Sequence, residues 1–209
     1  MEAMAEMADK SFDLAIVDPP YGIGINEQMR TANTKANWIQ HDYKQWDSSI
    51  PPDSYFTQLL RVSKEQIIWG GNYFALPLVR GWIVWDKKQE FSTGEFEMAW
   101  NSRDMPTKAF RMARCEAYVG ENKIHPTQKP VALYKWLLTN YAKAGDKILD
   151  THLGSGSSRI AAYDLGFDFT GYELDKDYFD AQEERFARHI AQARLFEPVP
   201  TIEQENLFT

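Results

Sequence analysis

Residues 18–21 place an acid, two prolines and a tyrosine directly after the short apolar run at 13–17. The carboxylate of Asp18 and the carbonyl of Pro19 are two acceptors that could hold both hydrogens of an amine. Because proline fixes φ and carries no N–H, Pro19 and Pro20 would keep that carbonyl in one direction. The exocyclic amine of adenine or cytosine is a poor nucleophile, since its lone pair is delocalised, and two such acceptors would draw its nitrogen towards tetrahedral geometry. Tyr21 would offer a flipped base a stacking surface. Taken alone, the tetrapeptide is also compatible with an ordinary turn after a strand.

A second candidate site is the glycine loop in DTHLGSGS, residues 150–157. Gly154 and Gly156 would let the backbone turn tightly and approach a ligand closely. Glu173 ends the next predicted strand, where an acid can accept hydrogen bonds from ribose hydroxyls. A dinucleotide site needs a small residue where Arg159 stands, so adenosine without a pyrophosphate fits better, and S-adenosylmethionine is the common cofactor of that kind. A tight turn followed by a solvated glutamate is the structural alternative.

Both motifs follow predicted strands, and the pattern of elements explains how they would meet. Short β-branched and aromatic runs predict strands, and amphipathic spacing predicts helices, the last of which would bury Phe179, Phe186 and Ile190. The strands are expected at 13–17, 66–71, 81–86, 95–100, 147–150 and 169–173, and the helices at 53–61, 130–142, 157–166 and from about Lys176. This order predicts an α/β fold with a mostly parallel sheet and helices on both faces. Ligands of such sheets lie beyond the carboxyl ends of the strands, where both motifs fall.

Length and composition indicate one globular domain. The chain has 209 residues and a net charge of −7, with a single cysteine, Cys115, so we expect no disulfide framework and no Cys-rich zinc site. The apolar runs are too short to span a membrane, and the first residues lack the pattern of a signal peptide, so we expect a cytoplasmic protein. We predict a single domain over 1–197, a long active-site loop at 22–52 and a flexible tail at 198–209. The histidines show no metal-ligand spacing, so no metal is expected.

Three motifs resemble those of one family, the amino-group DNA methyltransferases of the D-P-P-Y type. The family's D-P-P-Y stands at 18–21, its H-P-T-Q-K-P at 125–130, and its D-P-F-x-G-S-G-T is similar to 150–157. The catalytic motif precedes the cofactor motif, as in the permuted class, and the resemblance covers nearly all of residues 11–188. It implies a Rossmann-like fold, S-adenosylmethionine as cofactor, DNA as partner and methyl transfer to the amine of a flipped base, in a restriction-modification system or elsewhere.

The resemblance also implies roles for individual residues. Asp18, Pro19, Pro20 and Tyr21 would hold and activate the amine. Thr127 and Lys129 would line the methionine end of the cofactor, and Glu173 would bind its ribose. The full set of implied cofactor residues is Asp18, Thr127, Lys129, Asp150, His152, Leu153, Gly154, Ser155, Gly156 and Glu173.

Departures from the family pattern leave alternatives open. An aspartate at position 18 favours adenine, since the cytosine-amine enzymes more often begin this motif with serine and the protein-glutamine enzymes with asparagine. Thr151 and His152 replace the usual Pro-Phe, which predicts a weaker aromatic contact with the cofactor. The family's strand ending in Gly-Asp is not found ahead of residue 11, so we expect a missing edge strand or a start further upstream. These departures keep a non-catalytic, nucleic-acid-binding subunit as an alternative.

Segment 101–123 is the candidate for target recognition. Arg103, Lys108, Arg111 and Arg114 gather there with one acid, Asp104, between them. Phosphate contacts require such basic side chains, so these four are the predicted DNA-binding residues, although a solvated loop would have the same composition. So short a segment predicts a short recognition sequence, low specificity, or help from a homodimer or a partner subunit.

Overall fold

The computed structural model describes residues 2–24, 47–88, 94–117 and 123–194. One seven-stranded sheet organises them, in the order β5-β3-β4-β2-β1-β6-β7. All neighbouring pairs are parallel except the two that β4 makes with β2 and β3. The strands are β1 (Phe12–Val17), β2 (Ser63–Trp69), β3 (Trp82–Asp86), β4 (Phe96–Asn101), β5 (Lys108–Arg111), β6 (Lys147–Asp150) and β7 (Asp168–Gly171). The predicted α/β class and mostly parallel sheet are confirmed.

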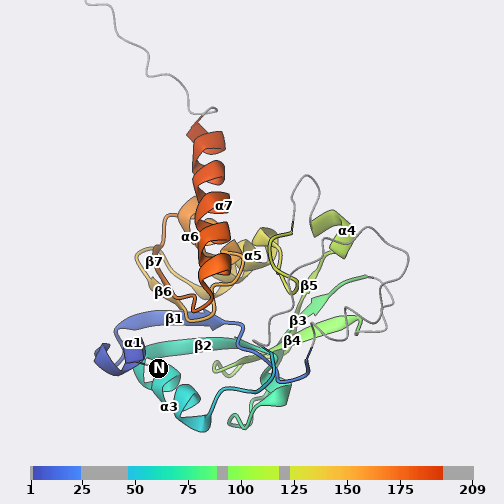
Figure 1. Ribbon diagram of the computed structural model, residues 1–209. Coiled ribbons are helices and arrows are strands. Elements are labelled where there is room, and N and C mark those ends of the chain that lie inside the picture. Colours follow the sequence, from blue (N-terminus) through green and yellow to red (C-terminus); the bar gives the residue numbers. More distant parts are fainter. Residues whose placement is uncertain (1, 25–46, 89–93, 118–122, 195–209) are drawn as a thin grey trace, which may run out of the picture.

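Helices cover both faces of this sheet, as expected. Helices α5 and α6 lie on one face, while α1 and α3 lie on the other (Figure 1). The helical segments are α1 (Glu2–Glu6), α3 (Asp53–Val62), the 3-10 turn η1 (Gly71–Tyr73), α4 (Arg114–Ala117), α5 (Val131–Tyr141), α6 (Ser157–Asp164) and α7 (Lys176–Arg194). Pro130 stands immediately before α5, where its fixed φ of −66° leads into the first turn.

Strand β1 shows why the sequence ahead of residue 18 is continuously apolar. Leu14 and Ile16 pack in the core cluster shared with α5 and α6, whereas Ala15 and Val17 pack in the cluster shared with α3. All four side chains are at most 1% exposed. A strand in the middle of a parallel sheet is buried on both faces, which requires apolar residues at every position. This rigid strand carries Asp18 at its end.

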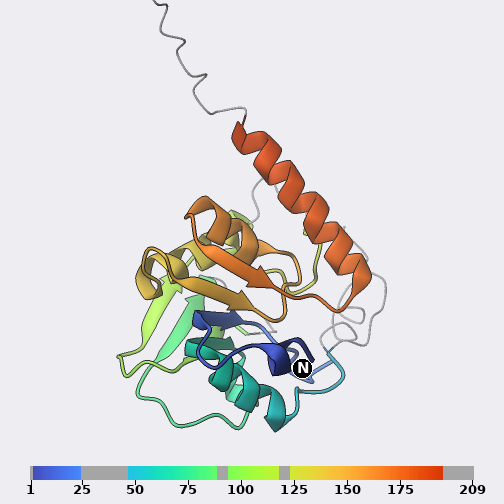
Figure 2. The same ribbon diagram turned by 90° about the vertical axis from the view of Figure 1, so that its left-hand side faces the viewer.

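Helix α7 differs from the prediction. Phe179 is 42% exposed, and Phe186 and Ile190 are only half-buried, while the most buried side chains of the helix are Tyr178, Gln182 and Arg185. The helix projects beyond the sheet (Figure 2), so its inner face meets the glycine loop rather than an apolar layer. Polar side chains suit that contact because they bind the loop's backbone and hydroxyl groups.

Several predicted segments lie wholly or partly outside the described residues. Positions 25–46 of the long loop at 22–52, positions 118–122 of the segment at 101–123, and the tail at 198–209 are in this group. Within 101–123, the structure forms β5 and α4. The described helices include none with the length and hydrophobicity to span a membrane. The single-domain assignment over 1–197 stays a prediction.

Candidate active site

The D-P-P-Y tetrapeptide follows β1 and is held by one buried acid. Asp47, which is 4% exposed, accepts hydrogen bonds at Oδ1 from the backbone N–H of Tyr21 (2.7 Å) and of Gly22 (2.9 Å). The Tyr21 hydroxyl donates to Asp18 Oδ1 at 2.6 Å. Burial raises the pKa of Tyr21 well above its usual value, so the phenol remains a donor. The tetrapeptide is thus fixed through both its backbone and its side chains.

The ring of Tyr21 already has aromatic neighbours. It stacks on Tyr73 with centroids 5.1 Å apart and planes 10° from parallel, and the ring of Phe74 meets it edge-on. Tyr73 is 45% exposed, so this pair of rings reaches the surface beside Asp18. Tyr73, two residues after the strand predicted at 66–71, was not singled out from the sequence. A base that stacks on Tyr21 would therefore use ring surface that Tyr73 leaves open.

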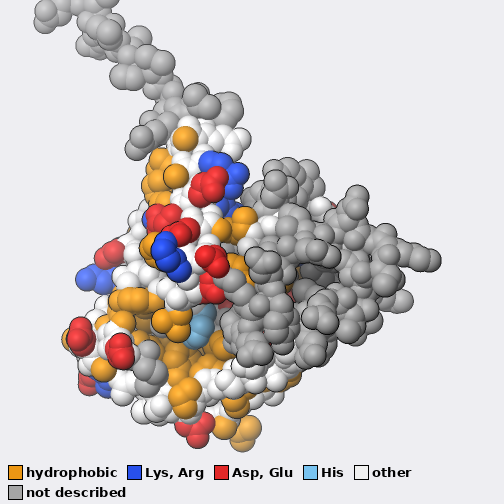
Figure 3. Space-filling view, viewed as in Figure 1, with side chains coloured by type: hydrophobic (Ala, Val, Ile, Leu, Met, Phe, Trp, Pro, Cys, Tyr) orange, Lys and Arg blue, Asp and Glu red, His pale blue; other side chains and the backbone are white. Residues whose placement is uncertain are grey.

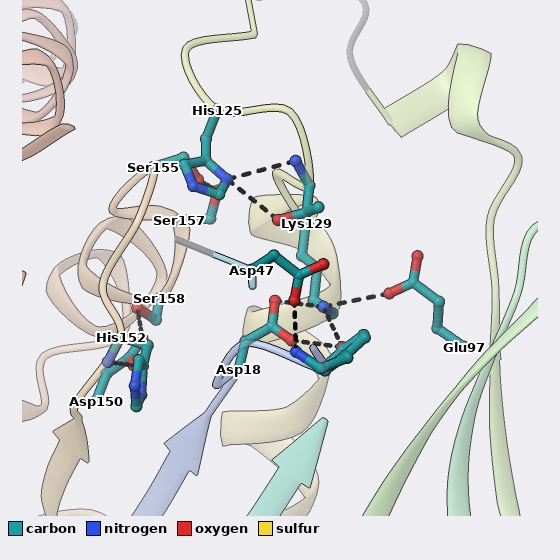
Figure 4. A network of polar contacts seen from close by, with 12 residues as sticks. Asp18, Asp47, Glu97, His125, Lys129, Asp150, His152, Ser155, Ser157 and Ser158 are labelled. Carbon is teal, nitrogen blue, oxygen red and sulfur yellow. Dashed lines mark hydrogen bonds and ion pairs between the residues drawn. The ribbon is translucent and has the colours of Figure 1, made fainter. Parts of the chain in front are cut away.

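Lys129 lies against Asp18, the predicted catalytic acid. Its ammonium forms an ion pair with Asp18 Oδ2, and the side chain is 2% exposed (Figure 4). Burial raises the pKa of Asp18, and the positive charge of Lys129 opposes that shift. The role predicted for Lys129, at the methionine end of the cofactor, stays a prediction, but its ammonium is already committed to Asp18. From sequence, nothing links positions 18 and 129.

The H-P-T-Q-K-P segment joins the two motifs in space. At its start, His125 packs its ring on Tyr178, and a Cβ at Gly154 would lie 3.9 Å from that ring. Thr127 contacts the same histidine, with Oγ1 3.1 Å from His125 Nδ1. At its end, Lys129 holds Asp18. One short segment therefore reaches from the glycine loop to Asp18.

The sheet brings the motifs together as well. Strands β1 and β6 are parallel neighbours, with Leu14 opposite Ile148 and Ala15 opposite Leu149. Continuing this register places Asp18 level with His152. Figure 4 shows the strand arrows ending beneath the two groups of side chains. The sequence prediction that both motifs share one edge of the sheet is therefore what the structure shows.

The glycine loop is built by left-handed glycines and held from outside. Gly154 and Gly156 have φ of +50° and +72°, which favour glycine. Glu173 Oε2 accepts a hydrogen bond from the Gly154 N–H at 2.8 Å. On α7, Arg185 donates to the Ser155 carbonyl at 2.8 Å and to Ser157 Oγ at 2.9 Å. The loop thus has a defined shape before any ligand is considered.

Asp150, the last residue of β6, binds two groups of the segment that follows it. Its two carboxylate oxygens accept hydrogen bonds from Ser158 Oγ (2.6 Å) and from the His152 backbone N–H (3.0 Å). Burial raises the pKa of Asp150 to about 7, against the effect of these hydrogen bonds. The predicted contact between Asp150 and the cofactor stays a prediction, and the geometry gives this residue a part in shaping the loop.

The unusual Thr151-His152 pair is supported by α3. Thr151 Oγ1 lies 2.6 Å from the Tyr55 hydroxyl and 3.0 Å from His152 Nδ1. The rings of Tyr55 and His152 meet edge to face, with centroids 5.3 Å apart. Burial lowers the pKa of His152 to about 4, so its imidazole is neutral at neutral pH. A neutral ring with fixed neighbours thus stands where the family pattern has phenylalanine.

The four predicted DNA-binding residues are not brought together. Arg103 follows β4, which runs against the other strands, and therefore lies at the edge of the sheet opposite Asp18. Its guanidinium is paired with Glu65 and donates to the Tyr141 carbonyl at 2.6 Å. The DNA contact predicted for Arg103 stays a prediction, and the direction of β4, which the sequence does not reveal, places this residue away from Asp18.

The other three basic residues divide between the two ends of β5. Lys108 begins β5, at the end away from the site, and Arg111 ends it, beside Asp86 at the carboxyl end of β3. Arg114 begins α4, and its side chain lies outside what the structure describes. Arg111 is therefore the member of the group that the structure places at the edge of the sheet where Asp18 lies.

Several site residues were missed from the sequence. Each supports another part of the site through a contact between distant parts of the chain. The missed residues are Asp47, Tyr55, Lys87, Glu97 and Arg185. The sequence offered one signal for this set: the acid at position 97 stands between Phe96 and Met98 in a predicted strand. Among the described residues, no group of three or more potential ligands could hold a metal ion.

Comparison with solved structures defines the class of fold. M1.HpyAVI, solved as a complex with S-adenosylmethionine, aligns with a TM-score of 0.55 at 17% identity, over 84% of this chain and 90% of that chain. PvuII DNA methyltransferase, described as cytosine-N4-specific, aligns with a TM-score of 0.58 at 12% identity, over 88% and 82%. TTHA0409 from Thermus thermophilus, a putative DNA modification methylase, gives 0.54 at 17% identity, over 90% of each chain. The fold is that of the Rossmann-like methyltransferases.

Comparison of sequences finds the same kind of protein. A family model described as DNA methylase matches residues 82–184. Type II methyltransferase M.HpaI from Haemophilus parainfluenzae is 22% identical over 235 residues, covering 88% of this chain and 71% of that protein. Putative methylase YubD from Escherichia coli (strain K12) is 27% identical over 201 residues, covering 90% of this chain and 87% of that protein. The resemblance to amino-group DNA methyltransferases that the three motifs predicted is thus confirmed.

Proposed function

We propose that this protein transfers a methyl group from S-adenosylmethionine to the exocyclic amine of a flipped base in DNA, and that the base is adenine. The observation that carries the proposal is the position of Asp18. It directly follows β1, which pairs with β6, the strand that leads into the glycine loop, and residues 125–130 link the loop to it. Methyl donor and amine must meet in line, and this juxtaposition would bring them together.

The residues of the glycine loop fit such a cofactor. A carboxylate has about four lone-pair positions, and those of Glu173 accept N–H groups from Gly154 and Asp175, which leaves capacity for two ribose hydroxyls. Next to it, the side chain of Leu174 is 99% exposed, an apolar surface that an adenine ring could cover. Figure 3 shows hydrophobic side chains gathered around a histidine below α7.

The residues of the tetrapeptide would act on the amine by position and hydrogen bonding. The cofactor supplies an electrophilic methyl group on a sulfonium. Asp18 would accept one amine hydrogen and the Pro19 carbonyl the other, which turns the nitrogen lone pair towards that methyl group. Tyr21 and Lys129 each bind one oxygen of the Asp18 carboxylate and so set its direction.

The choice of adenine rests on the aspartate at position 18. Serine more often begins this motif in the cytosine-amine enzymes, while asparagine begins it in the enzymes that methylate protein glutamine. A cytosine-N4-specific enzyme is nevertheless among the structural neighbours, so cytosine is the alternative target.

The test is to incubate the protein with unmethylated DNA and cofactor labelled in the methyl group, and then to digest the DNA to nucleosides. Label in N6-methyldeoxyadenosine supports the proposal, and label in N4-methyldeoxycytidine replaces adenine by cytosine. Asp18→Ala is the matched control: it should abolish transfer and leave the affinity for the cofactor within a few-fold. Cofactor binding by the wild type without label in either nucleoside would contradict the proposal.

A further inference from the structure

Lys129 has a second acid beside it, from a different part of the sheet. Glu97, near the start of β4, places Oε2 3.2 Å from Lys129 Nζ, on the side away from Asp18 (Figure 4). The Lys129 side chain is 2% exposed, that of Asp18 16% and that of Glu97 29%. The ammonium therefore lies between two carboxylates, largely shielded from water.

Glu97 is itself fixed by another buried lysine. Lys87 Nζ, just after β3, lies 3.1 Å from Glu97 Oε1 and donates to the Gly94 carbonyl at 3.1 Å. Lys87 is 4% exposed. Charges thus alternate from Lys87 through Glu97 and Lys129 to Asp18, and the two ammonium groups balance the two carboxylates. Such balance is what makes burial of four charges tolerable.

A lysine ammonium is a point charge on a flexible stem, so its position depends on its partners. Two carboxylates fix the Lys129 ammonium from opposite sides. Its Nζ also lies 3.4 Å from the Tyr21 hydroxyl and 5.1 Å from the centre of the Trp69 ring. Without Glu97, the ammonium would lose one of its two anionic partners and could move over the Asp18 carboxylate. It would then cover the oxygen surface on which the target amine depends.

The backbone of β4 does not need a glutamate at position 97. Its ladder to β3 pairs Glu97 with Trp85 through main-chain groups, and its neighbours Phe96 and Met98 are exposed. We propose that Glu97 is a positioning residue for methyl transfer: it holds the Lys129 ammonium on Asp18 Oδ2 and thereby sets the direction in which the Asp18 carboxylate meets the amine. This inference rests on the function proposed above.

The first test is the single-turnover rate of methyl transfer at saturating cofactor and DNA. Glu97→Gln keeps the size of the side chain and removes its charge. We expect the rate to fall by roughly 10- to 100-fold, since small misplacements of a reacting group cost that much. The cofactor dissociation constant, measured by calorimetry, should stay within about twofold, because Glu97 acts on chemistry rather than binding. Glu95→Gln, at an exposed position two residues earlier, is the matched control and should be unchanged.

A double-mutant cycle separates positioning from general damage. If Glu97 acts through Lys129, then adding Glu97→Gln to Lys129→Met should cause no further loss of rate. An equal loss in both backgrounds, or an unchanged rate in Glu97→Gln alone, would overturn the inference.

A third measurement does not depend on methylation. Brief acetylation with acetic anhydride, read by mass spectrometry, should leave Lys129 protected in the wild type and labelled several-fold faster in Glu97→Gln. Unchanged labelling of Lys129 would count against the inference. If the wild type transfers no methyl group to DNA, the proposed function fails, and the labelling result decides separately whether Glu97 holds Lys129.

Discussion

The ring of Tyr21 lies directly on the backbone of Gly70. A Cβ built at Gly70 would stand less than 3.0 Å from three carbons of that ring, closer than real Cβ atoms come. Gly70 also has a φ of +66°, a conformation that favours glycine. The end of β2 is therefore shaped so that the ring of Tyr21 can lie against the main chain.

The first prediction is that Gly70→Ala displaces Tyr21 and, with it, the hydrogen bond to Asp18. We expect methyl transfer to fall by about 100-fold or more while the affinity for the cofactor changes little. Gly166→Ala is the matched control, because Gly166 has a similar φ of +73° and nothing within 4 Å of an added Cβ. It should lose about 1 kcal/mol of stability and keep its single-turnover rate. Equal rates in the two variants would show that the packing of Tyr21 on Gly70 is not needed.

The order of the elements was predictable because it depends on local pattern. The strand at 147–150 was predicted with the bounds that the structure shows, since its apolar run is short and ends at an acid. The common edge of the two motifs followed from the rule for parallel sheets. The direction of β4 was not predictable, because an antiparallel strand has no local mark, and neither was the separation of Arg103 from Asp18 that this direction causes.

The charge network at the site was beyond sequence reasoning for a related reason. Lys129 was predicted at the cofactor because the resemblance of residues 125–130 to a family motif implies that role. Its partners, Asp18 and Glu97, come from strands separated from it by long stretches of chain. Ion pairs of this kind depend on where strands end in space, and no periodicity in the sequence encodes that.

The second prediction concerns the pKa of His152, which burial lowers from 6.5 to about 4. Between these values the unfolded chain binds a proton that the folded protein does not, so His152 makes the folded state less stable as the pH falls. His152→Phe removes this effect. On going from pH 7.5 to pH 5, the unfolding free energy of the variant should rise relative to the wild type by about 1 kcal/mol, allowing for the partial exposure of the ring.

Chemical denaturation at the two pH values measures this difference. The pKa of Asp150 is raised to about 7, so this residue makes the folded state more stable as the pH falls. Asp150 is present in both proteins, so its contribution cancels in the comparison. Tyr55→Phe is the control: it removes a hydroxyl from the same cluster, and its effect should be equal at both pH values. Parallel pH profiles for His152→Phe and the wild type would show that the imidazole is not buried in its neutral form.

The third prediction is that Arg185 maintains the glycine loop. Arg185→Met keeps the apolar stem but leaves the Ser155 carbonyl and Ser157 Oγ without this donor. We expect the cofactor affinity to fall by about tenfold and the stability by about 1–3 kcal/mol. Calorimetry and thermal unfolding measure the two effects. Arg188→Met, at an exposed position of the same helix, should change neither. The same cofactor affinity in both variants would remove Arg185 from the site.

The last prediction concerns the DNA surface. The Arg111 side chain is 69% exposed, and its Nε lies 3.3 Å from Asp86 Oδ2. Asp86 is at the carboxyl end of β3, on the edge of the sheet where Asp18 lies. If it contacts a phosphate, Arg111→Gln should weaken binding to all DNA sequences alike and reduce the slope of log K against log salt by about 1. Lys108→Gln, at the other end of the same strand, should leave the slope unchanged because that end of β5 lies away from the site. Fluorescence anisotropy at several salt concentrations measures both slopes. An equal change for Lys108 and Arg111 would mean that the DNA does not approach from the edge that carries Asp18.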